Sequence, residues 1–290
     1  MKSRAYPTWF AAGALALYGV FSLLPSILGV GFSFTDWNSH STQLHWVGLD
    51  NFATILSSSK TYVHFIVNTV LFTVATIFLK TVIALALALL LTEGVRRLSS
   101  FYRAFIYLPA VLPILVVSLI FRSVFNPATG LLNETLRTVG LGGLAMHWLT
   151  DVSLAMWSVI AVDTWRGIGY IMVILIAGLQ AIPRDYYEAA SIDGATGRQT
   201  FRHITLPLLM PVLTVTTVLN LLYGLKVFDI VFVLTNGGPG RATDTVYTAV
   251  FDDFSKGRYG IATALSTLLF LVMIVLGFLT IRVMRREEVS

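Results

Sequence analysis

The sequence predicts an all-α integral membrane protein with six transmembrane helices. Hydrophobic residues make up 56% of the 290 residues and charged residues 12%, whereas a soluble domain carries about 25% charged residues. The hydrophobic residues also fall in long continuous runs. Continuous runs favour spanning helices over the alternating strands of a membrane barrel.

Six apolar runs are long enough to cross a hydrocarbon core, which takes about 20 residues of helix. They are Trp9–Phe34, Phe65–Leu91, Phe105–Phe125, Ser153–Leu179, Leu208–Leu234 and Tyr259–Val283. The first run is longer than the core of a signal peptide, about 7–15 residues, and no clear cleavage site follows it, so we expect a retained span. Pro109 and Pro113 are expected to bend the third span.

The connectors between these runs divide the chain into three predicted regions. Residues 1–62 form an N-terminal span and a periplasmic segment, because Asp36–Val63 is too polar to span and its Trp37 and Trp46 suit a membrane interface. Residues 63–284 form a transmembrane domain of five spans, with external loops at Asn126–Asp151 and Thr235–Arg258. Residues 285–290 form a tail.

Lys and Arg are distributed unevenly between the two predicted sides of the membrane. Eleven lie on the side of the termini: Lys2, Arg4, Arg96, Arg97, Arg103, Arg184, Arg198, Arg202, Arg282, Arg285 and Arg286. Five lie on the other side: Lys60, Arg137, Arg241, Lys256 and Arg258. Since cytoplasmic loops are enriched in basic residues, both termini are predicted to be cytoplasmic. The same enrichment explains the net charge of +5 without a nucleic-acid partner.

One polar segment on the cytoplasmic side, Pro183–Pro207, has the pattern of a folded element. Asp185 and Glu188 resemble a capping box, and Tyr186–Ile192 suits about two helical turns. Asp193-Gly194 predicts a turn, and Thr196–Leu206 a second helix closed by Pro207. A capped helix between spans is a candidate docking element for a cytoplasmic partner, although an ordered loop without a partner is the simpler interpretation.

No catalytic arrangement is recognisable in the sequence. The five histidines lack metal-ligand spacing, and there is no phosphate-binding Gly-x-x-x-x-Gly-Lys loop. Cys is absent, which excludes disulfides, thiolate metal sites and a Cys nucleophile. We therefore expect a protein that is not an enzyme and that takes any nucleotide energy from another chain.

Charged residues within the apolar runs are the other candidate site. These candidates are Asp163, Arg166, Lys226 and Asp229, which fall in the fourth and fifth runs. Lys80 and Arg122, in the second and third runs, only complete the count of basic residues. Charge at this depth is costly, so such residues line an aqueous path or neutralise one another. Pairs of Asp163 with Arg166 and of Lys226 with Asp229, three residues apart on a helix, would serve neutralisation, and Asp229 can also snorkel to the interface. Both interpretations stay open.

The fourth run adds aromatic side chains to these charges. Trp165, Gly167 and Tyr170 place aromatic faces, a small residue and hydrogen-bond donors on one span. Such a set suits a sugar, and it equally suits ordinary helix packing.

The cytoplasmic segment carries a recognisable motif. Glu188-Ala189-Ala190, then Gly194 after three residues, then Ile204-x-Leu206-Pro207 after nine more, resembles the EAA loop of membrane subunits of binding-protein-dependent ABC importers. The stretches Trp46–Phe52, Thr164–Gly167 and Thr235–Pro239 resemble the carbohydrate-uptake subfamily, with maltose-type and glycerol-phosphate-type permeases closest in pattern. The resemblance covers nearly the whole chain.

The resemblance implies a type I ABC importer permease fold and a set of site residues. Glu188, Ala189, Ala190 and Gly194, with Asp185 beside them, would form the EAA coupling helix that docks on an ATP-binding subunit. The implied substrate path includes Trp165, Gly167 and Tyr170, and the intramembrane charges Asp163, Arg166 and Lys226 are added to it as candidates. Arg166 stands where the maltose-type pattern has an apolar residue, and Asp163 replaces an amide.

The expected function is a permease subunit, in the inner membrane of a bacterial or archaeal cell, that imports a sugar or oligosaccharide. The implied partners are the lipid bilayer, a second and related but different permease, two ATP-binding subunits and an extracytoplasmic solute-binding protein. This chain is expected to bind no cofactor, since ATP and Mg would sit on the partner subunit. The alternatives are import of glycerol phosphate or another polyol by the same machinery, and a stand-alone secondary transporter.

Overall fold

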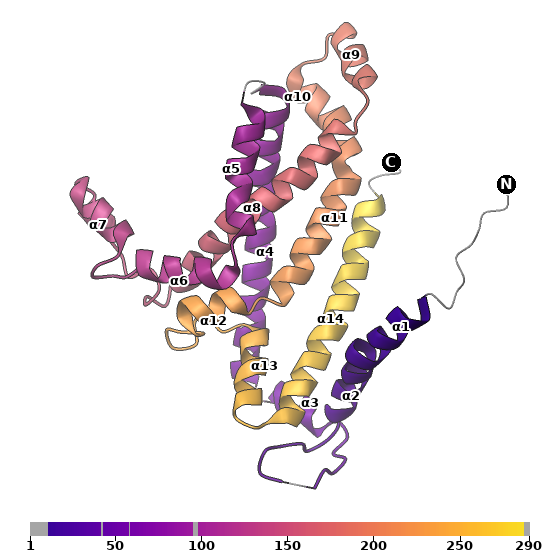
Figure 1. Cartoon of the computed structure of the whole chain (residues 1–290), viewed down its shortest axis with the longest axis vertical. Helices are drawn as coiled ribbons and strands as arrows, with labels where there is room; N and C mark the ends of the chain where they lie inside the picture. Colours follow the sequence, from indigo (N-terminus) through magenta and orange to yellow (C-terminus); the bar gives the residue numbers. More distant parts are fainter. Residues whose placement is uncertain (1–10, 42, 58, 95–97, 287–290) are drawn as a thin grey trace, which may run out of the picture. The chain divides into compact units, whose positions relative to one another are not determined.

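The computed structural model describes residues 11–41, 43–57, 59–94 and 98–286. Across these residues the chain is helical, and only a single bridge between Thr35 and Trp46 has strand-like pairing. Five helices are long and apolar enough to cross a membrane, and a sixth span is present if one sharply bent helix pair is counted as one. The prediction of an all-α membrane protein is confirmed (Figure 1).

The helices follow one another through short connectors. In chain order they are α1 (Ala12–Tyr18), α2 (Leu24–Phe32), α3 (Asp50–Ser57), α4 (Ser59–Leu89), α5 (Ser99–Val111), α6 (Ile114–Val124), α7 (Leu131–Thr138), α8 (Ala155–Gln180), α9 (Arg184–Ile192), α10 (Gly197–Thr200), α11 (Leu206–Leu225), α12 (Asp229–Thr235), α13 (Val246–Ser255) and α14 (Tyr259–Arg286). The π-helical turns Gly19–Leu23 and Phe201–Thr205 join α1 to α2 and α10 to α11. The external connectors that the sequence predicted as loops thus contain α3, α7 and α13.

Some sequence predictions fall on residues outside the described ranges. These are the start of the first span at Trp9, the basic residues Lys2, Arg4, Arg96 and Arg97, and the end of the tail at residues 287–290. The first span is described from Ala12 to Phe32.

The chain divides into two compact units. The first consists of Met1–Tyr62 and Ala249–Leu271, and the second of Val63–Thr248 and Val272–Ser290. In the first unit the Asn51 side chain donates hydrogen bonds to the carbonyls of Ser33 and Thr35, at 2.9 and 2.8 Å. These two bonds hold the start of α3 against the end of α2.

The second unit contains two apolar cores. One core joins α4, α6, α8 and α12 around Phe72, Val117, Ile160 and Ile230. The other joins α4, α8 and α11 around Met172, Leu175 and Leu209. Helix α8 contributes to both, and fourteen of its residues are buried. It is therefore the central helix of this unit.

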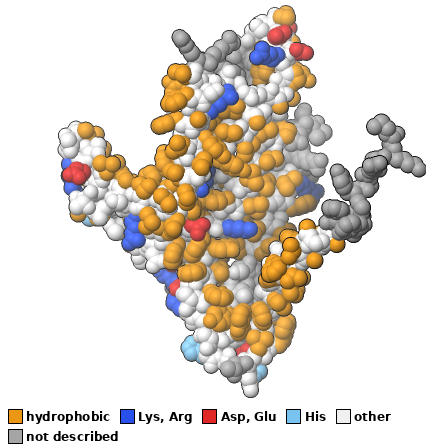
Figure 2. All heavy atoms as spheres, in the orientation of Figure 1, with side chains coloured by type: hydrophobic (Ala, Val, Ile, Leu, Met, Phe, Trp, Pro, Cys, Tyr) orange, Lys and Arg blue, Asp and Glu red, His pale blue; other side chains and the backbone are white. Residues whose placement is uncertain are grey.

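Outside these cores, large hydrophobic side chains remain exposed along the spanning helices. Phe78 on α4 and Phe278 on α14 are 64% and 62% exposed. Figure 2 shows hydrophobic side chains over much of the visible face. Soluble proteins rarely expose apolar surface on this scale, so the exposed side chains fit contact with lipid.

The third apolar run is broken as predicted, but only one of its two prolines lies at the break. Helices α5 and α6 meet at an angle of 92° across Leu112 and Pro113. Leu112 is extended, with φ −67° and ψ 137°, because proline disfavours the helical conformation of the residue before it. Pro109 stays inside α5, so the break follows from Pro113 alone.

The predicted fifth span, Leu208–Leu234, has the wrong boundaries. The spanning helix runs from Gly197 to Leu225, and the rest of the apolar run forms the separate helix α12. The backbone carbonyl of Val227, in the break, accepts a hydrogen bond of 3.0 Å from Thr245 Oγ1. An apolar run alone does not distinguish one long span from a span followed by a short buried helix.

Candidate functional site

The predicted docking segment forms helix α9 and a sharp turn. The helix begins at Arg184, after Pro183 in an extended conformation. The predicted capping box between Asp185 and Glu188 is wrong, because Asp185 already lies in the first helical turn. The acidic side chain there still complements the positive end of the helix dipole.

The turn after α9 is a Schellman motif centred on Gly194. The Ala195 amide donates to the Ala190 carbonyl at 2.9 Å, and the Gly194 amide donates to the Ser191 carbonyl at 3.2 Å. This closure places the residue after the helix in the left-handed region, and Gly194 has φ +74°. The predicted turn at Asp193-Gly194 is confirmed, and its geometry requires glycine because a Cβ is strained there.

The outer face of α9 is accessible. Asp185, Glu188 and Ala189 are exposed, whereas Ala190 is buried in the chain itself at 8% exposure. Tyr186 and Ile192 add exposed apolar surface, 51% and 86% of each side chain. In Figure 2, side chains of both charges gather at the end of the molecule that carries α9. The face therefore combines charge with an apolar patch.

The helix after this turn starts with a capping box and does not stop at Pro207. The Thr196 amide donates to Gln199 Oε1 at 2.8 Å at the start of α10. The chain then stays helical through Phe201–Thr205 into α11, with Pro207 in the first turn of α11. The predicted termination at Pro207 is wrong. In a regular α-helix the proline ring would clash with the carbonyl four residues earlier. The π-helical turn that precedes Pro207 changes the backbone spacing at that carbonyl, so the helix continues.

Three spans meet at a buried charged cluster. Lys80 Nζ on α4 lies 2.6 Å from Asp163 Oδ2 on α8, and these side chains are 4% and 1% exposed. Tyr223 on α11 donates a hydrogen bond of 2.7 Å to Asp163 Oδ1. The Lys80 ammonium also lies 4.7 Å from the centre of the Tyr223 ring. The short contact between Lys80 Nζ and Asp163 Oδ2 thus pairs opposite charges away from water.

The helices approach closely around this cluster. A Cβ on Gly167 would lie 2.6 Å from Lys80 Cε, and one on Gly224 would lie 2.7 Å from Thr73 Oγ1. Gly167 thus provides the space through which the Lys80 side chain reaches Asp163. Small residues at such contacts are typical of packed membrane helices.

Comparison with known proteins identifies the family of this chain. Residues 80–287 match the family model described as "Binding-protein-dependent transport system inner membrane component". The chain belongs to this family. It is therefore the permease component of an ABC importer and not an enzyme, and ATP hydrolysis takes place on a separate subunit of such importers.

Two relatives and one solved structure illustrate the similarity of this permease to known proteins. A "Probable ABC transporter permease protein YurN" of Bacillus subtilis is 34% identical, with 97% of this chain and 96% of the relative covered. A "Trehalose/maltose transport system permease protein MalF" of Thermococcus litoralis is 37% identical, with 79% and 76% covered. A solved bacterial ABC transporter "involved in the import of the acidic polysaccharide alginate" has a chain that is 25% identical, with a TM-score of 0.83 and 96% of both chains covered.

The solved neighbour confirms the expected type I ABC importer permease fold. The family match disfavours a stand-alone secondary transporter, because this family works with binding proteins.

In the permease, the residues predicted along the solute path occupy different environments. The predicted pairing of Asp163 with Arg166 is wrong, since the partner of Asp163 is Lys80. Arg166 Nε instead donates to the Leu112 carbonyl at 3.3 Å, at the break between α5 and α6.

Three other predicted path residues of the permease, Trp165, Tyr170 and Lys226, are exposed, whereas Gly167 packs against Lys80. Trp165 and Tyr170 are 44% and 45% exposed on α8, and the Trp165 ring packs edge-on against Phe121. Lys226 is exposed at the end of α11, and no ion pair of the described residues joins it to Asp229.

Sequence reasoning missed two members of the charged cluster. Lys80 was visible as a single charge inside an apolar run, and pairing it with Asp163 on another span would have identified the contact. Tyr223 carries no such signal, because a tyrosine in a membrane helix is common. No group of three or more His, Cys, Asp or Glu side chains that could hold a metal ion occurs in the described ranges.

Proposed function

We propose that this permease forms the path for a sugar or oligosaccharide and receives the motion of an ATP-binding subunit through α9. The observation that carries the proposal is the construction of α9. A helix between two spans presents Asp185, Glu188 and Ala189 outward, and the Schellman turn at Gly194 fixes its end. Ala190 contributes differently, because as a small buried residue it lets α9 pack closely on its own chain.

The carbohydrate class rests on relatives and on the exposed aromatic residues of α8. The relative from Thermococcus litoralis is named for trehalose and maltose, and the solved neighbour for alginate. Trp165 and Tyr170 offer ring faces that suit a sugar, and they are accessible. Arg166 uses its Nε on the Leu112 carbonyl, whereas Lys226 is exposed and joins none of the ion pairs of the described residues. The path therefore suits an acidic sugar as well as a neutral one, and glycerol phosphate is the alternative substrate.

The proposed assembly contains a second permease, two ATP-binding subunits that carry ATP and Mg, and an extracytoplasmic solute-binding protein. Both termini and α9 face the cytoplasm in this arrangement, as the distribution of basic residues suggests. ATP-driven closure of the partner subunits would move α9 and thereby favour one of two conformations of the path. Coupling of this kind requires that the partners bind the two conformations with different affinity.

The test is a pair of glycine substitutions in the reconstituted complex. Gly194 (φ +74°) and Gly140 (φ +82°) both adopt the left-handed conformation, and neither has a neighbouring atom within 4 Å of an added Cβ. G194V and G140V therefore carry similar backbone strain at two different places. G194V is expected to abolish ATP hydrolysis stimulated by substrate and binding protein, and G140V to retain it. Unchanged stimulation in an assembled G194V complex would refute the coupling role.

A further inference from the structure

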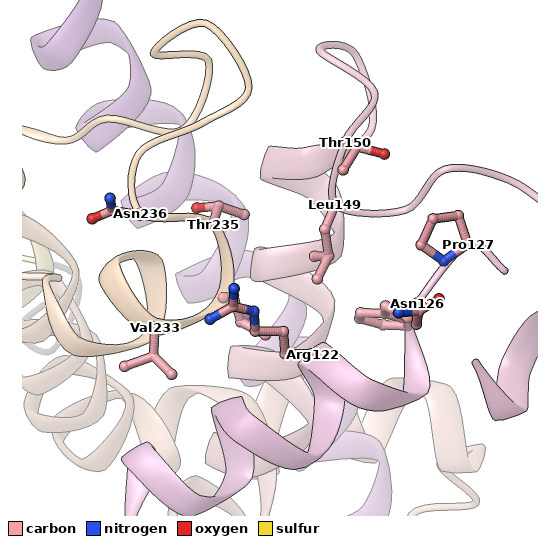
Figure 3. Close-up of a pocket in the computed structure, with 10 residues that line it drawn as sticks. Arg122, Asn126, Pro127, Leu149, Thr150, Val233, Thr235 and Asn236 are labelled. Atoms are coloured by element: carbon pink, nitrogen blue, oxygen red, sulfur yellow. The ribbon is translucent and has the colours of Figure 1, made fainter. Parts of the chain in front are cut away.

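A pocket of about 300 Å³ lies where α6 and α12 end, beside the turn that leads into α8 (Figure 3). Its polar lining residues are Arg122, Asn126, Thr150, Thr235 and Asn236, and Phe125 and Leu149 are among its apolar walls. Thr150 lies just before the start of α8, whereas α9 follows the end of α8. A 26-residue helix is about 39 Å long, so the pocket and α9 lie at opposite ends of a span.

The pocket presents an uncompensated positive charge. Arg122 is exposed in the last turn of α6, and the described ranges give it neither an ion pair nor a hydrogen bond. Its side chain extends from α6 toward Val233 and Thr235 of α12 (Figure 3). None of the lining residues is acidic. The pocket therefore lacks an internal counterion.

Among the other polar side chains, Asn126 is arranged to donate rather than accept. Asn126 Oδ1 already accepts hydrogen bonds from the backbone amides of Ala128 and Thr129, at 2.9 and 3.1 Å. These bonds leave its Nδ2 group as the part available to a ligand. A guanidinium beside amide donors is suited to a carboxylate, which Arg binds through two parallel hydrogen bonds. The apolar walls suit the short hydrocarbon stem that carries such a carboxylate.

The place of the pocket favours a protein side chain over a free solute. Pockets for small molecules range from about 300 to 1,000 Å³, and this one is at the lower limit. It is built from helix ends and turns, at the end of α8 that faces outward if α9 is cytoplasmic. An arginine that receives a carboxylate in a pocket with apolar walls is a common anchor of protein interfaces.

We propose that this pocket receives an Asp or Glu side chain of the solute-binding protein, whose carboxylate pairs with Arg122. The inference rests on the proposed function and assigns one contact of that partner. Arg122 also lies at a helix C-terminus, where a cation is favourable without any partner, and the experiment separates these two roles.

The experiment measures ATP hydrolysis by the complex in nanodiscs as a function of binding-protein concentration. The probe is the solute-binding protein that stimulates the wild-type complex. R122A is expected to raise the concentration for half-maximal stimulation about tenfold or more, as for a truncated charged anchor. R137A removes an exposed positive charge from α7, outside the pocket lining, and is expected to change this concentration less than twofold. If the R122A complex does not assemble, R122K is measured in its place, because lysine keeps the positive charge but cannot form the two parallel hydrogen bonds of arginine.

Charge reversal identifies the partner group. R122E is expected to be strongly impaired, and a single Asp→Lys or Glu→Lys change on the binding protein is expected to restore stimulation. The inference is overturned if R122A behaves like R137A, or if no single lysine change restores R122E. It is also overturned if R122A changes transport at saturating binding protein but leaves the concentration for half-maximal stimulation unchanged. That result would mean that the pocket binds the solute and not the binding protein. A wild-type complex that no binding protein stimulates would instead refute the proposed function.

Discussion

Lys80 Nζ lies 2.6 Å from Asp163 Oδ2, and both side chains are almost fully buried between α4 and α8. The permease has a second ion pair of the same length, between Lys256 Nζ and Asp252 Oδ2, but its side chains are 53% and 35% exposed. The two pairs share chemistry and distance and differ in burial. Removing one partner of a buried pair leaves a charge in a medium that cannot solvate it, whereas an exposed charge is solvated by water.

This difference predicts the stability of three single variants and one double variant. K80M and D163N are each expected to lower the free energy of unfolding by about 3–5 kcal/mol. K256M is expected to change it by about 1 kcal/mol or less. The double variant K80M/D163N removes both charges and keeps an acceptor for Tyr223, so it should recover most of the loss. Thermal unfolding of the purified complex in detergent provides the measurement, and equal stability of K80M and K256M would contradict the assignment.

Gly167 should be required only while Lys80 occupies the space beside it. A Cβ at this position would lie 2.6 Å from Lys80 Cε, so G167A is expected to cost about 1–3 kcal/mol, as overpacking does. In a K80A background the same change should cost much less. G277A on α14 is the matched control, because nothing lies within 4 Å of its added Cβ. An equal cost of G167A in both backgrounds would show that another contact fixes the glycine.

Arg166 is expected to stabilise the break between α5 and α6. R166M leaves the Leu112 carbonyl without the hydrogen bond that Arg166 Nε donates, at a cost of about 1–3 kcal/mol. The effect should be local, so hydrogen exchange of the Val117 amide, which bonds to the Pro113 carbonyl at 3.1 Å, is expected to accelerate. R198A, an exposed arginine on α10, should leave this amide unchanged. A selective rise in KM for an anionic solute would instead place Arg166 in the path.

The spanning helices could be predicted from the sequence because length and apolarity decide them. The same signal misplaced the end of the fifth span, since Val227 and Ile230 are as apolar as lipid-facing residues yet lie buried in a core with α6. The Asp185 cap was also misplaced. The extended Pro183 sets the helix start, and the capping hydrogen bond belongs to Thr196 and Gln199.

The charged cluster could be predicted only in part. Asp163 stood out as a charge at depth, but a rule based on spacing within one helix paired it with Arg166. Its true partners, Lys80 and Tyr223, lie on other spans, and only tertiary packing brings positions 80, 163 and 223 together. The turn at Gly194 was predicted correctly because backbone conformation there depends on neighbouring residues alone.

The orientation of α8 in the membrane gives the last prediction. The permease has no Cys, so single cysteines can be introduced without removing others. Ser191 is exposed on α9, and Thr129 is exposed just before α7. They flank the two ends of α8, whose length of about 39 Å exceeds the hydrocarbon core of about 30 Å.

With α9 in the cytoplasm, S191C should react with a membrane-impermeant maleimide only after right-side-out vesicles are opened. T129C should react in intact vesicles, and A84C, whose position is fully buried on α4, should stay unlabelled in both. The reverse pattern would invert the topology suggested by the basic residues. Labelling of S191C and T129C from the same side would mean that α8 does not cross the membrane between them, since an impermeant reagent reaches only one face of an intact vesicle.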